Sequence, residues 1–141
     1  MNNATFFFNQ PKNEPVFSYA KGSKERELLS KELEKQYNQC IEIPIIINGK
    51  EIRTGNVSEV VMPTEHSHVL AKFHKADKET VQKAIEAALE ARKKWENVHW
   101  IDRCSIMLRA AELLAGKYRY VINAATMLGQ GKNPFQAEID S

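Results

Sequence analysis

Hydrophobic residues recur at helical spacing along much of the chain. Over residues 24–38, apolar side chains lie roughly on one side of a helix with Lys and Glu elsewhere, and Ser23 can cap its start. Asp77 is a good N-cap for a second, longer helix that runs to about Trp95. The apolar stripe of this helix contains Val81, Ala84, Ile85, Ala88, Leu89 and Trp95. These stretches predict two amphipathic helices, each with one face to bury.

The helical pattern continues in the second half of the chain. One helix is expected to start near Asp102 and to end or bend at Gly116, and the pattern resumes as far as Leu128. The expected inward positions are Cys104, Met107, Leu108, Ala111 and Leu114. Pro134 suits the first position of a last helix over residues 135–141. Because isolated helices become marginal only at ~12–15 residues, we expect the chain to be cut there and not finished.

Short apolar runs typical of strands lie between the first two helices. Two of them, residues 41–47 and 50–53, flank Asn48-Gly49. This pair predicts a hairpin, because a type I′ turn needs a positive φ at both central residues. Pro44 cannot donate a hydrogen bond, so its strand is expected at a sheet edge or at a bulge. Further strands are expected over residues 57–62 and 69–74, with a polar loop over 64–67.

The pattern divides the chain into three parts. Residues 1–22 show no period, and we interpret them as an extended N-terminal arm laid over a larger body. Residues 23–76 hold a helix, the hairpin and strands, and residues 77–141 are helical. The fold class is therefore α/β.

Composition narrows the function classes. The chain has 141 residues, 43% hydrophobic and 27% charged, which is typical of a folded globular chain. Its net charge of +2, with interleaved basic and acidic residues, gives no reason to expect nucleic acid or a membrane surface as a partner. The N-terminus has neither the pattern of a signal peptide nor that of a mitochondrial transit peptide.

The residues that most often carry chemistry give no strong signal. Cys104 lies on an apolar helix face and Cys40 precedes a strand, so we interpret both as inert thiols, with Cys104 buried. His66 and His68 could share a metal in a loop, but no third ligand is evident at a suitable spacing. Trp95 and Trp100 are expected to fill the junction between two helices.

A glycine-rich stretch, residues 129–132, is similar to a phosphate loop only superficially. It lacks the spacing Gly-x-x-x-x-Gly-Lys-Ser/Thr, and no Gly-x-Gly-x-x-Gly follows a strand. We interpret it as a connection between two helices, so no cofactor-binding residue and no metal ligand are predicted.

Several segments, in their order along the chain, carry a family resemblance. They are Asn13–Val16, Gly22-Ser23, Val69–Phe73, Ala76–Lys78, Ala84–Trp95, Asp102-Arg103, Ala110–Gly116, Ala125–Lys132 and Gln136–Asp140. Together they resemble the 1-pyrroline-5-carboxylate dehydrogenases, a branch of the aldehyde dehydrogenase superfamily. The chain departs at Asn133-Pro134, where the family usually has Thr and a small apolar residue.

The resemblance implies a fold and an activity. The fold would be the N-terminal part of an aldehyde dehydrogenase, incomplete as a domain: an arm, strands that bridge domains or subunits, and the start of the cofactor domain. The activity would be NAD-dependent oxidation of L-glutamate 5-semialdehyde to L-glutamate in proline degradation, by a homo-oligomer in the cytoplasm, or in the mitochondrial matrix of a eukaryote. In the family, the nucleophilic Cys, the base Glu and the nucleotide-binding residues lie further along the chain, so no catalytic residue is assigned here.

The resemblance also implies one substrate-binding residue. In the family, the Glu of Gln-Ala-Glu-Ile-Asp lies by the amino-acid end of the substrate, and here that residue is Glu138. A carboxylate is a charge-assisted acceptor for the substrate ammonium. Without the resemblance, Glu138 would be interpreted as an ordinary acidic residue in the first turn of a helix.

A second function class stays open at this point. A non-catalytic interaction module derived from the enzyme would keep the arm and hairpin and pair with a full-length subunit. The nucleotide sequence past Ser141 separates the two: an open frame indicates a fragment, and a stop codon indicates a module.

Overall fold

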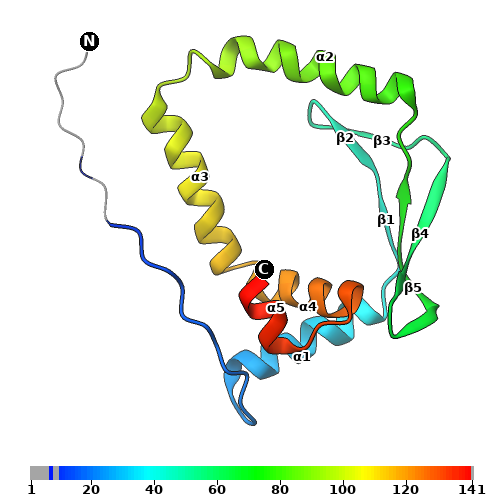
Figure 1. Cartoon of the computed structure of the whole chain (residues 1–141), viewed down its shortest axis with the longest axis vertical. Coiled ribbons are helices and arrows are strands. Elements are labelled where there is room, and N and C mark those ends of the chain that lie inside the picture. Colours follow the sequence, from blue (N-terminus) through cyan, green and yellow to red (C-terminus); the bar gives the residue numbers. More distant parts are fainter. Residues whose placement is uncertain (1–6, 8–9, 141) are drawn as a thin grey trace.

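The described part of the chain consists of helices and short strands. The computed structural model describes residue 7 and residues 10–140. The rest of the predicted arm and the final position of the last predicted helix lie outside these residues. Figure 1 shows α1, α4 and α5 together at the bottom, the strands at the right, α2 across the top and α3 at the left.

The strands form two separate sheets. In the first, β1 (Ile41–Ile43) pairs in parallel with β5 (Glu65–His74), and β4 (Val57–Met62) pairs with β5 in antiparallel fashion. In the second, β2 (Ile45–Ile47) and β3 (Lys50–Ile52) form an antiparallel hairpin. The predicted hairpin is confirmed.

The turn and the proline explain where the hairpin begins and ends. Asn48 has a φ of 51° and Gly49 a φ of 72°, as a type I′ turn requires. Pro44 separates β1 from β2, and the two strands on either side of it join different sheets. Because Pro44 offers no N–H to a ladder, it is the point at which the chain leaves one sheet for the other.

The prediction of a polar loop over residues 64–67 is wrong in its bounds. Strand β5 already begins at Glu65, and only Pro63 and Thr64 form the turn. Residues 65–67 are exposed, so their polar side chains need no apolar face, while Glu65 still pairs with Met62 of β4. The ladder has register shifts between Val60 and Met62, at the irregular end of the pair.

The helices begin and end close to the predicted positions. Helix α1 (Lys24–Tyr37) is capped by the Ser23 side chain, and α2 (Lys78–Trp95) by Asp77. Helix α3 (Trp100–Ala115) ends at Gly116. Helix α4 (Arg119–Gln130) includes Gly129 and ends at Gly131, whose left-handed φ of 67° suits glycine, and α5 (Pro134–Asp140) follows.

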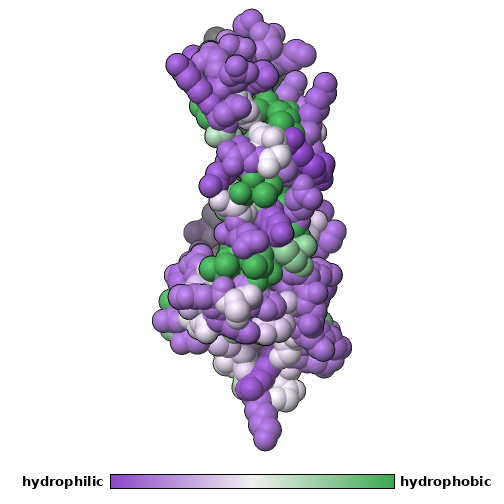
Figure 2. All heavy atoms as spheres, turned by 90° about the vertical axis from the view of Figure 1, so that its right-hand side faces the viewer, coloured by the Kyte–Doolittle hydropathy of each residue, from purple (hydrophilic) through white to green (hydrophobic). Residues whose placement is uncertain are grey.

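The buried apolar core is small and lies where α1 packs on α4. Its buried members are Tyr19, Leu29 and Ala124, with Phe17, Leu33, Tyr120 and Met127 partly buried against them. Elsewhere apolar residues reach the surface, and Figure 2 shows separate apolar patches among hydrophilic residues on the sheet side.

The apolar stripes predicted for α2 and α3 form, but the expectation that they face inward is wrong here. Ile85 is 49% exposed, Leu89 56% and Met107 60%. The periodicity placed these residues on shared helix faces, but the described residues leave those faces about half exposed. None of the helices described is long and apolar enough to cross a membrane.

Candidate functional site

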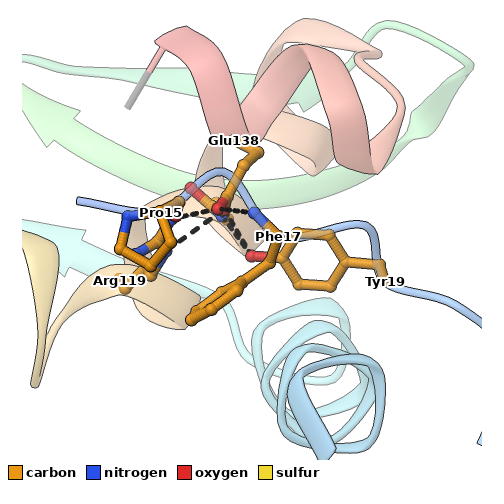
Figure 3. Close-up of polar contacts among 6 residues, drawn as sticks. Pro15, Phe17, Tyr19, Arg119 and Glu138 are labelled. Atoms are coloured by element: carbon orange, nitrogen blue, oxygen red, sulfur yellow. Dashed lines mark hydrogen bonds and ion pairs between the residues drawn. The ribbon is translucent and has the colours of Figure 1, made fainter. Parts of the chain in front are cut away.

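The most developed polar site lies where three segments far apart in sequence meet. Glu138 of α5 reaches Arg119 and Asn123 of α4, and both helices are met by residues 15–19 of the N-terminal segment (Figure 3). The Glu138 side chain is 0% exposed and that of Arg119 is 9% exposed, so the charge pair is taken out of water.

Both oxygens of the Glu138 carboxylate accept hydrogen bonds. Oε1 accepts from the Phe17 N–H at 2.8 Å and from Nη2 of Arg119. Oε2 accepts from the Tyr19 hydroxyl at 2.5 Å, from Nδ2 of Asn123 at 2.7 Å and from Nε of Arg119 at 3.3 Å. The carboxylate is therefore enclosed by donors on both sides, as a buried charge requires.

The donors are themselves held in place. Nη2 of Arg119 also donates to the Pro15 carbonyl, and its guanidinium lies over the Phe17 ring, 4.2 Å from the ring centroid. Asn123 is 1% exposed and donates to the Tyr19 hydroxyl at 2.9 Å. The site is therefore one connected network.

The network fixes the charge states of its members. Burial alone would raise the pKa of Glu138, but the hydrogen bonds from Arg119, Phe17, Tyr19 and Asn123 outweigh it and lower that pKa below its ordinary value. Burial and the neighbouring Glu138 raise the pKa of Tyr19 to about 12. Burial works to lower the pKa of Arg119, yet Glu138 raises it overall. At neutral pH, Glu138 and Arg119 are charged and Tyr19 keeps its proton.

The space beside Glu138 is small. A cavity of about 10 Å³ is lined by Glu14, Arg119, Asn123 and Glu138, among others. That volume is comparable to what one water molecule needs. The role of Glu138 in binding the substrate ammonium stays a prediction, and in this structure its lone pairs are directed at groups of the same chain.

Sequence reasoning singled out Glu138 but missed its partners. Arg119 and Asn123 are four residues apart on α4, so they share a face, and that spacing within an otherwise apolar helix was the available signal. No signal in the sequence pointed to Tyr19, because its contacts lie more than a hundred residues away along the chain.

The two cysteines lie apart from this site and from each other. Both are exposed, so the expectation that Cys104 is buried is wrong for the described residues. The α3 face that carries it is apolar, as predicted, but it stays uncovered. Cys104, Trp95 and Trp100 line an open groove of about 550 Å³, so the two indoles line the junction of α2 and α3 without filling it.

The remaining candidates have local roles. His66 and His68 lie in β5 and not in a loop; Nε2 of His68 lies 2.8 Å from the Tyr37 carbonyl oxygen, and its ring stacks on that of Tyr37 at 4.0 Å. Within residues 7 and 10–140, no group of three or more His, Cys, Asp or Glu residues could hold a metal ion. Lys132 pairs with Asp140, and Gly131 caps α4.

Comparison with known proteins gives one consistent group of relatives. Residues 51–141 match the aldehyde dehydrogenase family. The chain is 50% identical over 139 residues to the delta-1-pyrroline-5-carboxylate dehydrogenase of Agaricus bisporus, covering 98% of this chain and 26% of the relative. It is 46% identical over 129 residues to the mitochondrial enzyme of that name from Homo sapiens, covering 92% of this chain and 23% of the relative.

Solved structures agree with the sequence relatives. The delta-pyrroline-5-carboxylate dehydrogenase of Mycobacterium tuberculosis, bound with NAD and cobalamin, superposes with a TM-score of 0.94 at 39% identity, over 99% of this chain and 26% of that one. A mutant of the Thermus thermophilus 1-pyrroline-5-carboxylate dehydrogenase has a TM-score of 0.88 at 26% identity, over 96% and 26% of the two chains. The chain thus spans about a quarter of the length of the relatives it matches, and its fold corresponds to their N-terminal part.

Proposed function

Because the chain belongs to the aldehyde dehydrogenase family, we propose that the protein that carries it is an NAD-dependent 1-pyrroline-5-carboxylate dehydrogenase. It would oxidise L-glutamate 5-semialdehyde to L-glutamate in proline degradation. The observation that carries the proposal is the 50% identity to the Agaricus bisporus enzyme across 98% of this chain.

The reaction needs groups that the described residues do not bring together. Aldehyde oxidation through a covalent intermediate needs a thiolate nucleophile, donors for the oxyanion and a base. Cys40 and Cys104 are exposed at separate places, and neither lies in the polar network around Glu138. The proposal therefore assigns the chemical step to parts of the protein beyond these residues, and assigns to this chain the scaffold that surrounds them.

NAD would accept the hydride in this reaction. The glycine-rich stretch does not form a phosphate loop, because it ends α4 as a helix cap and Lys132 is paired with Asp140. We assign no residue of this chain to the cofactor. Support for NAD as the cofactor comes from the Mycobacterium tuberculosis relative, whose structure holds it.

The proposal extends to the organisation of the protein. Residues 1–22 would serve as an arm, residues 23–76 as elements that bridge domains or subunits of a homo-oligomer, and residues 77–141 as the start of the cofactor domain. The hairpin supports the second part, since Ile46 is 60% exposed on β2 and available for contact. The compartment would be the cytoplasm, or the mitochondrial matrix in a eukaryote, as for relatives named mitochondrial.

The proposal is tested by following NADH formation from L-glutamate 5-semialdehyde by the protein that carries this chain. We expect turnover with the semialdehyde, and we expect it to persist in the Cys40→Ser and Cys104→Ser variants. Failure to form NADH from the semialdehyde at saturating NAD would refute the activity. Loss of turnover in either folded cysteine variant would instead place the nucleophile within this chain.

A further inference from the structure

We infer that residues 15–19 form a strap across α4 and α5, and that the Glu138 carboxylate is the group that fastens it. The strap touches the charge pair at each end and in its middle. The Pro15 carbonyl accepts from Arg119, the Phe17 N–H donates to Glu138, and the Tyr19 hydroxyl donates to the same carboxylate (Figure 3). Two of these three contacts use the backbone, so they fix the path of the strap itself.

A carboxylate suits this position better than a neutral side chain. It accepts hydrogen bonds from four different residues at once, and all of them are donors toward it. With the Glu138 side chain fully buried, loss of its charge would leave Arg119 buried without a counter-ion. The fastening is thus a charge-dependent contact and not a matter of shape alone.

The same carboxylate positions α5. The helix has seven residues, fewer than the ~12–15 at which isolated helices become marginal. Only Ala137 and Glu138 of α5 are buried, whereas Phe135 is 61% and Ile139 56% exposed. Within the described residues, Glu138 is the polar tie between α5, α4 and the strap.

The strap is held in a conformation that needs support. Tyr19 has a φ of 52°, in the left-handed region that bulky residues adopt at a cost in energy. Tyr19 is 5% exposed, and its hydroxyl donates to Glu138 and accepts from Nδ2 of Asn123 at 2.9 Å. Removing the fastener is therefore expected to release the strap while the β4–β5 ladder, which makes none of these contacts, stays closed.

Hydrogen exchange at the Phe17 amide tests the inference in the protein that carries this chain, independently of any activity. Tyr19→Phe keeps the ring and removes one donor to a charged acceptor, so Phe17 exchange should accelerate roughly 10- to 150-fold. Glu138→Gln should accelerate it at least as much, because Arg119 loses its counter-ion. Amides of the β4–β5 ladder should exchange as in the unaltered protein.

The matched control is Glu112→Gln, which neutralises the exposed ion pair of Glu112 with Arg109. It should leave Phe17 exchange unchanged, because exposed pairs contribute little. Unchanged Phe17 exchange in both Tyr19→Phe and Glu138→Gln would overturn the inference. Equal acceleration at Phe17 and in the β4–β5 ladder would also overturn it, since Glu138 would then support the whole fold and not the strap.

Discussion

The strap region of this chain buries polar side chains, whereas the α2–α3 region exposes apolar ones. Around Glu138, charged and polar side chains are enclosed and bonded to one another, with Asn123 only 1% exposed. Along α2 and α3, apolar side chains such as Leu89 and Met107 are more than half exposed. Both regions thus depart from the usual distribution, in which apolar residues are buried and charged residues are exposed.

The two regions differ in where their contacts lie. The Glu138 carboxylate accepts all of its described hydrogen bonds from Phe17, Tyr19, Arg119 and Asn123. Many apolar side chains of α2 and α3 are about half exposed in the described residues, and exposed faces of this extent mark contact surfaces. Since the chain spans about a quarter of its relatives, we expect the remaining parts of such a protein to cover these faces.

The largest expected effect comes from removing Arg119, the partner of Glu138 in the buried charge pair. Arg119→Met leaves the buried Glu138 carboxylate without its counter-ion, and should lower the free energy of unfolding by roughly 3–5 kcal/mol. Arg109→Met removes a partner from an exposed pair and should cost about 0–1 kcal/mol. Urea unfolding of both variants measures the contrast, and equal losses would mean that burial of the network does not set its strength.

The pH dependence sharpens the same comparison. Tyr19 has a pKa of about 12 in place of 10.0, so its contribution is fully present below pH 10 and is lost as pH rises through about 12. The loss should reach about 3 kcal/mol at most. Urea unfolding between pH 9 and 12 should show a steeper fall for the unaltered protein than for Tyr19→Phe. If the free energy of unfolding fell equally steeply with pH in both proteins, Tyr19 would not contribute to the network.

Acid should also weaken the network, through protonation of Glu138. The pKa of Glu138 is lowered from an ordinary value near 4.5, so its contribution is present above that value and is lost as pH falls through the lowered pKa. The charged or titratable groups that face it are Arg119 and Tyr19, with Glu14 beside the same small cavity. At neutral pH the strap is therefore expected to be closed.

The smallest expected effect concerns the cysteines. If the remaining chain covers α3, Cys104 should react with a thiol reagent roughly tenfold or more slowly than Cys40 in the folded protein. In urea the two thiols should react alike, which controls for their intrinsic reactivity. Equal labelling in the folded protein would show that the α3 face is open, and the contrast with the strap region would then fail.

Local structure could be predicted from the sequence because its causes are local. Ser23 and Asp77 cap their helices through hydrogen bonds three residues away, and Asn48-Gly49 sets the hairpin through its own φ values. The start of β5 at Glu65 was missed, because exposed polar side chains on a strand resemble those of a loop.

The candidate site could be predicted only in part. The family resemblance drew attention to Glu138, but its surroundings depend on contacts with Phe17 and Tyr19, about 120 residues away. The burial of Cys104 was inferred from periodicity, which reports which residues share a face and not whether another element covers it. Long-range packing decides both questions.

The central claim is that Glu138 fastens the strap, and Glu138→Ala tests it most directly in the protein that carries this chain. Specificity constants would be measured with L-glutamate 5-semialdehyde and with a simple aldehyde that lacks the amino-acid end, together with the free energy of unfolding. We predict that the free energy of unfolding falls and that both specificity constants change by the same factor. A loss of roughly 10- to 150-fold for the semialdehyde alone, with unaltered unfolding, would place Glu138 at the substrate ammonium and contradict the claim.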